Sequence, residues 1–98
     1  MDLNQIKALI EAKHYETASH VDERIEAGEF DPEDMEQAIL TATRIHKTER
    51  DELSQSTDGK KYTIIGRSRA GNAFYTCGKV KADHLGRHYF FITAHQAD

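Results

Sequence analysis

The spacing of apolar residues changes from a helical period in the N-terminal part of this chain to a strand-like period in the C-terminal part. This change of period limits the folds that the chain can adopt. In residues 1–43 apolar side chains recur at the three- and four-residue spacing of amphipathic helices. After Lys60, three runs are rich in aromatic and β-branched residues and alternate as strands do. Helices followed by strands predict an α+β fold, with the N-terminal helices packed on a C-terminal sheet.

Three helices are expected in the first part of the chain. They are predicted at residues 3–13, at residues 18–27 and from residue 32 onward. Asp2 or Asn4 can cap the first helix, and Gly28 ends the second. Asp31 is the predicted N-cap of the third helix, and Pro32 occupies its first position.

The strand-like runs are KKYTIIGR, NAFYTCGKVK and RHYFFITAH, and the segments SRAG and ADHLG separate them. Connections this short predict an antiparallel meander over residues 60–96. Residues 44–59 are predicted to form a loop, with a short strand around Arg44 to Thr48, so that the sheet has three or four strands. The length of 98 residues fits one domain covering the whole chain, residues 1–98.

The alternation within each run predicts which side chains share a face of the sheet. In the last strand one face is predicted to hold Tyr89, Phe91, Thr93 and His95. In the middle strand, one face is predicted to hold Tyr75, Cys77, Lys79 and Lys81. One face of the sheet should pack on the helices, and the other should gather Lys, Arg, His and Tyr side chains, which can bind phosphate and stack on bases.

Charge also divides within the chain. Residues 1–53 hold 14 acidic and 6 basic residues, whereas residues 54–98 hold 3 acidic and 7 basic residues, and the whole chain has a net charge of −4. The pattern therefore predicts an acidic helical layer beside a cationic sheet, a surface suited to nucleic acid. The net negative charge opposes RNA binding unless the cations gather on a separate face.

Several classes of protein are excluded by composition. The single cysteine, Cys77, cannot form an internal disulfide, and no run of about 18 apolar residues offers a membrane span. The N-terminus is acidic and amphipathic, unlike a secretion signal. We expect a cytoplasmic protein without a cofactor and without membrane association.

A metal site is not predicted, although the chain has six histidines. His84 and His88 are four residues apart, but Gly86 between them predicts a hairpin turn instead of a helix that would align them. No CxxC or HExxH motif is present. The alternative is a three-ligand cluster of Cys77, His84 and His88 around the hairpin.

Three segments follow one another in an order that resembles a known bacterial family. They are SHVDERIEAGEFDPEDMEQAI, DGKKYTIIG and FFITAH. This order is similar to a domain of unknown function that begins with a Ser-His-x-x-x-Arg helix and neighbours the BrnT and RelE-like ribonuclease toxins. The likeness spans roughly residues 17–95, and its individual motifs are short. It implies an α+β fold of the RelE/BrnT type and, by analogy, RNA cleavage in a toxin–antitoxin system.

The resemblance also implies a set of site residues. His20 and Arg24 of the family helix are one turn apart, so a histidine acid or base would lie beside a phosphate clamp in metal-independent RNA cleavage. His95 and Tyr62 are the further catalytic candidates, and Thr93 lies at a matching position near His95. The predicted RNA-binding residues are Lys61, Arg67, Lys79, Lys81 and Arg87.

The same residues have a structural interpretation that needs no catalysis. Arg24 then pairs with a nearby carboxylate of Glu16, Asp22 or Glu23, and the cationic strand residues form a solvated face or edge. The final strand also lacks the compact run of Lys, Arg and Tyr that ribonuclease toxins of this type often carry. The alternative function is therefore a non-catalytic protein-interaction domain.

Such an interaction domain would dock a basic partner or an antitoxin-like protein on its acidic helical face, or form a homodimer through a strand edge. One structural observation separates the two functions. The enzyme requires His20, Arg24 and a strand residue such as His95 or Tyr62 to meet in one exposed concavity.

Overall fold

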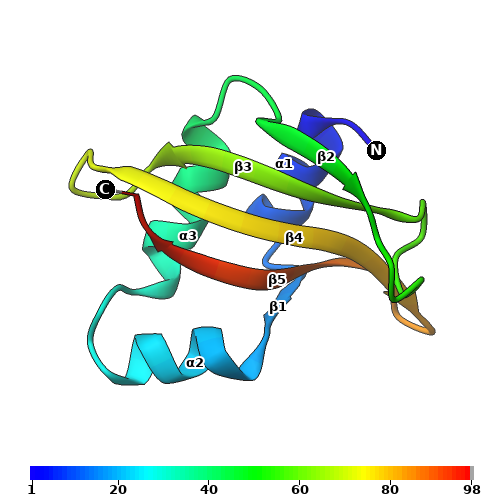
Figure 1. Cartoon of the computed structure of the whole chain (residues 1–98), viewed down its shortest axis with the longest axis horizontal. Coiled ribbons are helices and arrows are strands. Elements are labelled where there is room, and N and C mark those ends of the chain that lie inside the picture. The colour runs from blue at the N-terminus through cyan, green and yellow to red at the C-terminus, as the bar shows by residue number, and fades with distance from the viewer. Residues whose placement is uncertain (98) are drawn as a thin grey trace.

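The chain folds into three helices and five strands in the computed structural model, which describes residues 1–97 (Figure 1). The helices are α1 (Leu3–Glu11), α2 (Ser19–Glu26) and α3 (Pro32–Thr41). The strands are β1 (Tyr15–Thr17), β2 (Lys47–Arg50), β3 (Lys60–Arg67), β4 (Ala73–Asp83) and β5 (Gly86–Gln96). The predicted α+β class is confirmed, and all three helices precede strands β2 to β5. Within residues 1–97 no helix has both the length and the apolar character needed to cross a membrane.

The five strands form one mixed sheet in the order β1-β5-β4-β3-β2. Strands β3, β4 and β5 make the predicted antiparallel meander, and β2 adds to it beside β3. The prediction of a purely antiparallel sheet is wrong, because β1 pairs in parallel with β5. The sequence does not reveal β1 because three residues between two helices are too few for an alternating pattern. Strand β2 lies slightly beyond the predicted segment Arg44 to Thr48.

The helix ends follow local capping signals. The Asp2 side chain accepts a hydrogen bond from the backbone of Gln5 at 2.8 Å, and the Gln5 side chain accepts one from Asp2 at 2.9 Å. At α3, the Asp34 side chain accepts a hydrogen bond from the backbone of the N-cap Asp31 at 3.0 Å. Helix α1 ends before the predicted Lys13, because Lys13 adopts a left-handed conformation with φ of 61°.

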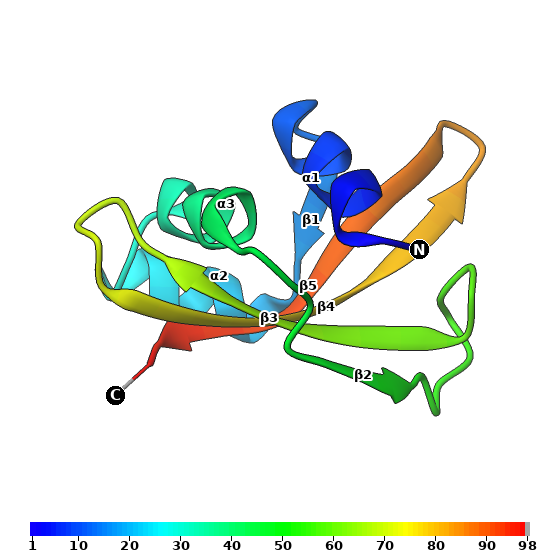
Figure 2. The same cartoon turned by 90° about the horizontal axis from the view of Figure 1, so that it is seen from above.

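Helices α1 and α3 cover one face of the sheet, and α2 lies beside β5 (Figures 1 and 2). Their apolar side chains meet those of β3, β4 and β5 in one cluster. Its largest fully buried members are Ile6, Ile10, Val21, Met35, Ile39, Tyr62, Ile64, Phe74, Val80, Tyr89 and Phe91. Helix α3 approaches β3 closely because β3 has a glycine there: a Cβ at Gly66 would lie 1.8 Å from the Ala38 carbonyl oxygen.

A β-bulge interrupts the pairing of β4 with β5. Cys77 lies opposite Thr93, but the next residue, Gly78, lies opposite Phe91. Ile92 is therefore an extra residue in β5, and the strand bends at this point. The bulge also allows a close contact, since a Cβ at Gly78 would lie within about 2.6 Å of the Tyr89 ring atoms.

The bulge changes which side chains of β5 face the helices. Tyr89 and Phe91 are fully buried, but after the bulge it is Ala94 that is fully buried. The prediction that Thr93 and His95 share a face with Tyr89 and Phe91 is therefore wrong. Both lie on the sheet face turned away from α1 and α3, which we call the open face. Its half-buried residues include Ile65, Tyr75, Lys81, Phe90, Thr93 and His95.

Candidate functional site

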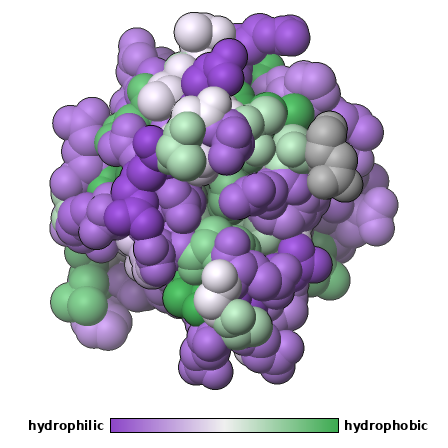
Figure 3. Space-filling model, turned by 90° about the vertical axis from the view of Figure 1, so that its left-hand side faces the viewer, coloured by the Kyte–Doolittle hydropathy of each residue, from purple (hydrophilic) through white to green (hydrophobic). Residues whose placement is uncertain are grey.

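A hollow opens at the end of β5, beside α2 and the turn that leads into α3. It has a volume of about 530 Å³ and is lined by Arg24, Glu29, Phe30, His95 and Gln96. Figure 3 shows this end of the molecule, where apolar surface runs between hydrophilic side chains. Two predicted catalytic residues, Arg24 and His95, thus line the same hollow although they are far apart in the sequence. We call this the Arg24–His95 hollow.

Helix α2 positions Arg24 by burying its other side chains. Val21 is fully buried and Ile25 is partly buried against the core. Arg24 follows Val21 by almost one turn and precedes Ile25, so it lies half-buried at the edge of the core. Its aliphatic stem can pack there while the guanidinium faces the hollow.

Two of the three carboxylates that the sequence offers as partners for Arg24, those of Glu16 and Asp22, interact elsewhere. Glu16 Oε1 lies 2.8 Å from His88 Nε2, and the Thr17 hydroxyl donates to Asp22. Within residues 1–97, no carboxylate lies within 4.0 Å of a nitrogen of the Arg24 guanidinium. The interpretation of Arg24 as the partner of a neighbouring acid is therefore wrong for this part of the chain.

The turn between α2 and α3 supplies the apolar wall of the hollow. Gly28 has a φ of 79°, a left-handed conformation that ends α2 and redirects the chain. Phe30 follows and packs edge to face on Phe74, with ring centroids 5.2 Å apart. Neither Phe30 nor Gln96 is among the residues predicted for the site. The only signal for Phe30 is its place as an apolar residue just before the cap of α3.

His95 is held in one orientation by its neighbours. Its ring stacks on Tyr75 across the strands, with centroids 4.7 Å apart and an interplanar angle of 19°. Its Nδ1 lies 2.9 Å from the Gln96 carbonyl oxygen. Because a carbonyl oxygen can only accept, Nδ1 carries the hydrogen in this contact. In the neutral ring with this tautomer, Nε2 carries the lone pair and can accept a proton from a substrate.

The other predicted catalytic residues do not line the hollow. His20 is exposed on α2, one turn before Arg24, so the predicted meeting of His20, Arg24 and His95 in one concavity is met only in part, by Arg24 and His95. Thr93 is half-buried on the open face, opposite Cys77. Tyr62 lies in the buried core, and its hydroxyl donates to Asp58. A substrate in the Arg24–His95 hollow therefore has no access to Tyr62.

The environment of Tyr62 also opposes a role in acid–base chemistry. Burial and the hydrogen bond to Asp58 raise the pKa of Tyr62 above its ordinary value. The amino group of Met1 lies 3.3 Å from both the Tyr62 hydroxyl and Asp58 Oδ2. These contacts satisfy the phenol within the fold.

Lys79 is not available to RNA, contrary to its predicted role. Its side chain is buried on the sheet under the β2–β3 loop, and Nζ lies 3.3 Å from Asp51 Oδ1 and 3.0 Å from Gln55 Oε1. The sequence shows only an alternating strand lysine. It does not show that a loop covers this part of the face.

The remaining predicted RNA-binding cations lie at separate places. Lys81 Nζ lies 4.3 Å from the centre of the Phe90 ring, a cation–π contact. Arg67 donates to a backbone carbonyl of the β3–β4 turn at 2.9 Å. Lys61 is half-buried on β3, and Arg87 is exposed at the start of β5. The structure thus brings Arg24 and His95 together but does not place the five predicted cations around them.

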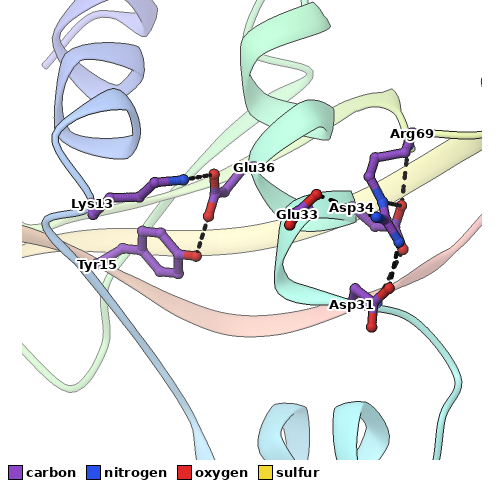
Figure 4. Close-up of polar contacts among 7 residues, drawn as sticks. All are labelled: Lys13, Tyr15, Asp31, Glu33, Asp34, Glu36 and Arg69. Carbon is purple, nitrogen blue, oxygen red and sulfur yellow. Dashed lines mark hydrogen bonds and ion pairs between the residues drawn. The ribbon is translucent and has the colours of Figure 1, made fainter.

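Two polar groups around α3 are satisfied within the fold (Figure 4). Glu36 is buried and accepts hydrogen bonds from Lys13 and Tyr15. Burial alone raises the pKa of the Glu36 carboxyl, but these two hydrogen bonds lower it overall. Burial and Glu36 together raise the pKa of Tyr15. These contacts tie the α1–β1 turn to α3.

The second group in Figure 4 surrounds Arg69 in the β3–β4 turn. Its guanidinium binds the carboxylates of Asp31, Glu33 and Asp34 at the start of α3. Burial raises the pKa of the Asp34 carboxyl, but backbone and Arg69 hydrogen bonds lower it overall. Neither group shown in Figure 4 is signalled in the sequence, because each joins segments that are distant along the chain.

The alternative metal-ligand set does not form in the described part of the chain. Within residues 1–97, His88 lies beside Glu16 and Asp83 instead of Cys77 and His84. Cys77 is buried, and burial raises the pKa of its thiol. It is therefore poorly suited to act as a thiolate ligand or nucleophile.

No family model, curated protein or solved structure matches this chain. The resemblance to the Ser-His-x-x-x-Arg family and to RelE-like toxins therefore stays a prediction. The functional proposal depends on the geometry of the Arg24–His95 hollow.

Proposed function

We propose that this domain binds the phosphodiester backbone of RNA in the Arg24–His95 hollow and cleaves it without a metal. The observation that carries the proposal is that Arg24 of α2 and His95 of β5 line one open hollow. A guanidinium can bind two phosphate oxygens at once, and an imidazole can exchange a proton at neutral pH. Both groups promote attack by a ribose 2′-hydroxyl on the neighbouring phosphorus.

In the proposed reaction, Nε2 of His95 accepts the proton of the 2′-hydroxyl while the O2′–P bond forms. Arg24 stabilises the negative charge that gathers on the non-bridging oxygens. The P–O5′ bond breaks, and the leaving 5′ oxygen takes a proton from His20 or from water. The products are a 2′,3′-cyclic phosphate and a 5′-hydroxyl.

The surroundings of the hollow favour a single-stranded substrate. Tyr75 is half-buried beside His95, so a base can stack on the exposed part of these rings. Arg24 is the one cation that lines the hollow within residues 1–97, and Glu29 lines it too. Few phosphates can therefore be neutralised, and we expect a shallow salt dependence of binding compared with a strongly basic ribonuclease.

The test is cleavage of a mixed single-stranded RNA by purified protein in EDTA. We expect Arg24→Gln and His95→Gln each to lower the rate by about 100-fold or more. Arg44→Gln and His46→Gln are matched controls, because both residues are exposed and lie outside the hollow. Terminal analysis should find cyclic phosphate in the products.

Two results would contradict this function. One is the absence of cleavage by the wild-type protein, and the other is an unchanged rate in both hollow variants. His20→Gln separates the two sources of the second proton, since only a role for His20 lowers the rate in that variant.

A second candidate function is the binding of a basic protein partner, and one observation favours it. Exposed carboxylates cluster on α2, on the turn that follows it and at the start of α3. They are Asp22, Glu23, Glu26, Glu29, Asp31 and Glu33. Within residues 1–97, only Asp31 and Glu33 of this set form ion pairs with a cation, Arg69. The others remain available for a lysine- or arginine-rich segment.

Titration with a lysine-rich peptide tests this second candidate. We expect binding that weakens with salt and is lost in the double variant Glu23→Gln/Glu26→Gln, whereas Glu11→Gln/Glu52→Gln is the matched control. Light scattering during size exclusion also tests the homodimer, since all four residues of the edge strand β2 are exposed. Equal peptide binding by both double variants would contradict this function.

A further inference from the structure

His88 lies near the start of β5, far along the strand from His95, and two carboxylates from other strands flank it. Its Nε2 is 2.8 Å from Oε1 of Glu16 in β1, and its Nδ1 is 4.0 Å from Oδ2 of Asp83 at the end of β4. One donor atom from each of the three residues lies within 4.8 Å of the other two. The pairing of β1 and β4 with β5 gathers these groups.

The charges of this cluster are not balanced by Lys or Arg. Within residues 1–97, no Lys or Arg nitrogen lies within 4.0 Å of a carboxylate oxygen of Glu16 or Asp83. With a neutral imidazole the three side chains carry two negative charges in close proximity, which repel each other. A cation bound between them removes this repulsion.

We propose that Glu16, Asp83 and His88 bind a divalent transition-metal ion of the Zn²⁺ class. One imidazole nitrogen and two carboxylate oxygens are a donor set that suits Zn²⁺ and neighbouring ions, whereas Mg²⁺ and Ca²⁺ prefer oxygen alone. A divalent ion also neutralises the two carboxylates. The donor chemistry therefore selects the ion as well as the site.

An ion takes one nitrogen of His88, so Glu16, which lies at Nε2, and Asp83, which lies at Nδ1, must turn toward the same nitrogen to close around it. Donors bound tetrahedrally at about 2.1 Å lie about 3.5 Å from one another. The carboxylate side chains of Glu16 and Asp83 are 57% and 45% exposed, so both can turn inward, whereas His88 is 15% exposed and is held by its strand. The imidazole is thus the fixed ligand and the carboxylates are the adjustable ones.

The site is open to solvent on one side. A hollow of about 290 Å³ adjoins the three residues, and His14, Leu85 and Arg87 also line it. Three protein ligands therefore leave room for a water molecule as a fourth ligand. The ion would link the three-residue strand β1 to the β4–β5 hairpin and hold this edge of the sheet together.

The test uses the full chain, stripped with EDTA and dialysed, and calorimetric titration with zinc sulfate alone. We expect one ion per chain and a rise in Tm with Zn²⁺ that Mg²⁺ and Ca²⁺ do not reproduce. Cobalt(II) chloride should give visible absorption bands of a low-symmetry site with nitrogen and oxygen ligands. His88→Gln and Glu16→Gln should each weaken Zn²⁺ binding by at least about ten-fold, because only two of the three ligands remain.

His46→Gln and His84→Gln are the matched controls, since both histidines are exposed and neither belongs to the cluster. Circular dichroism checks that each variant is folded, and Asp83→Asn replaces any variant that is not. The assignment is overturned by the absence of Zn²⁺ binding, by equal binding in His88→Gln and wild type, or by an equal response to Mg²⁺. RNA cleavage is not measured in this test. The proposal of Zn²⁺ binding can therefore be contradicted without affecting the proposal of RNA cleavage, and the reverse is also true.

Discussion

The two loops at the ends of β3 are both held by ion pairs. These pairs differ in burial, so their contributions to the stability of the fold should differ. The β2–β3 loop, residues 51–59, carries Asp51, which is 4% exposed and pairs with Lys79, which is 2% exposed. The β3–β4 turn, residues 68–72, carries Arg69, whose side chain is 47% exposed among three carboxylates. The exposed cluster has more ion pairs (Figure 4), and the buried pair is less accessible to water.

The buried carboxylate is satisfied almost entirely by the protein. Asp51 accepts hydrogen bonds from the backbone of Leu53, Gln55 and Ser56, in addition to Lys79. If Lys79 is removed, water cannot easily replace it. Around Arg69, water can solvate any group that loses its partner. Burial, more than the number of pairs, should therefore decide how strongly each loop depends on its charges.

The largest effect is expected for Lys79→Ala. This change leaves Asp51 charged and buried without its cation, and we expect a loss of about 3–5 kcal/mol in the free energy of unfolding. Urea unfolding followed by circular dichroism measures it. Lys81→Ala is the control on the same strand, because Lys81 is half-buried and makes no ion pair within residues 1–97. Equal losses in the two variants would show that burial is not the cause.

An intermediate effect is expected on acidification. Burial alone raises the pKa of Asp51, but backbone hydrogen bonds and Lys79 lower it to about 2, below its ordinary 3.8. The unfolded state therefore takes up a proton at higher pH than the folded state. The stability contributed by this carboxylate is present above the ordinary value and is lost as the pH falls from about 4 to about 2.

The difference between wild type and Asp51→Asn isolates this contribution, because other carboxylates titrate in both proteins. We expect the stability of wild type to fall more steeply with acidity over this interval. Parallel curves for the two proteins would mean that Asp51 does not titrate with a lowered pKa.

The smallest effect is expected for Arg69→Gln. Although this change removes three ion pairs, the guanidinium is half-exposed, so we expect only a small loss in the free energy of unfolding, well below that of Lys79→Ala. The loss should shrink further in 1 M salt, which screens surface charges. Unfolding measured at low and high salt checks this. A salt-independent loss as large as that of Lys79→Ala would abolish the distinction between the two loops.

The parts of the fold that the sequence predicts correctly depend on local chemistry. Asp31 and Pro32 mark the start of α3, and short connections predict the meander of β3 to β5. The parallel strand β1 and the bulge at Ile92 were not predictable in this way. Both are decided by pairing between distant segments, and one extra residue is enough to exchange the faces of a strand.

In the candidate site, too, local features could be predicted from the sequence, whereas contacts between distant segments could not. The spacing of His20 and Arg24 within one helix is visible in the sequence, but the meeting of Arg24 with His95 is decided by where α2 lies beside β5. Tyr62 and Lys79 alternate as strand residues should, yet the core buries the first and a loop buries the second. An alternating pattern separates two faces of a strand but does not say what covers each face.

The pairing of β1 with β5 has a consequence for protein synthesis. Residues 15–17 leave the ribosome well before Tyr89–Phe91, their partners in the sheet. Until β5 has been translated, β1 has no neighbour, and Val21 of α2 has no strand beside it to exclude water. The growing chain can therefore form its helices early, but this side of the domain must stay unassembled until the last strand arrives.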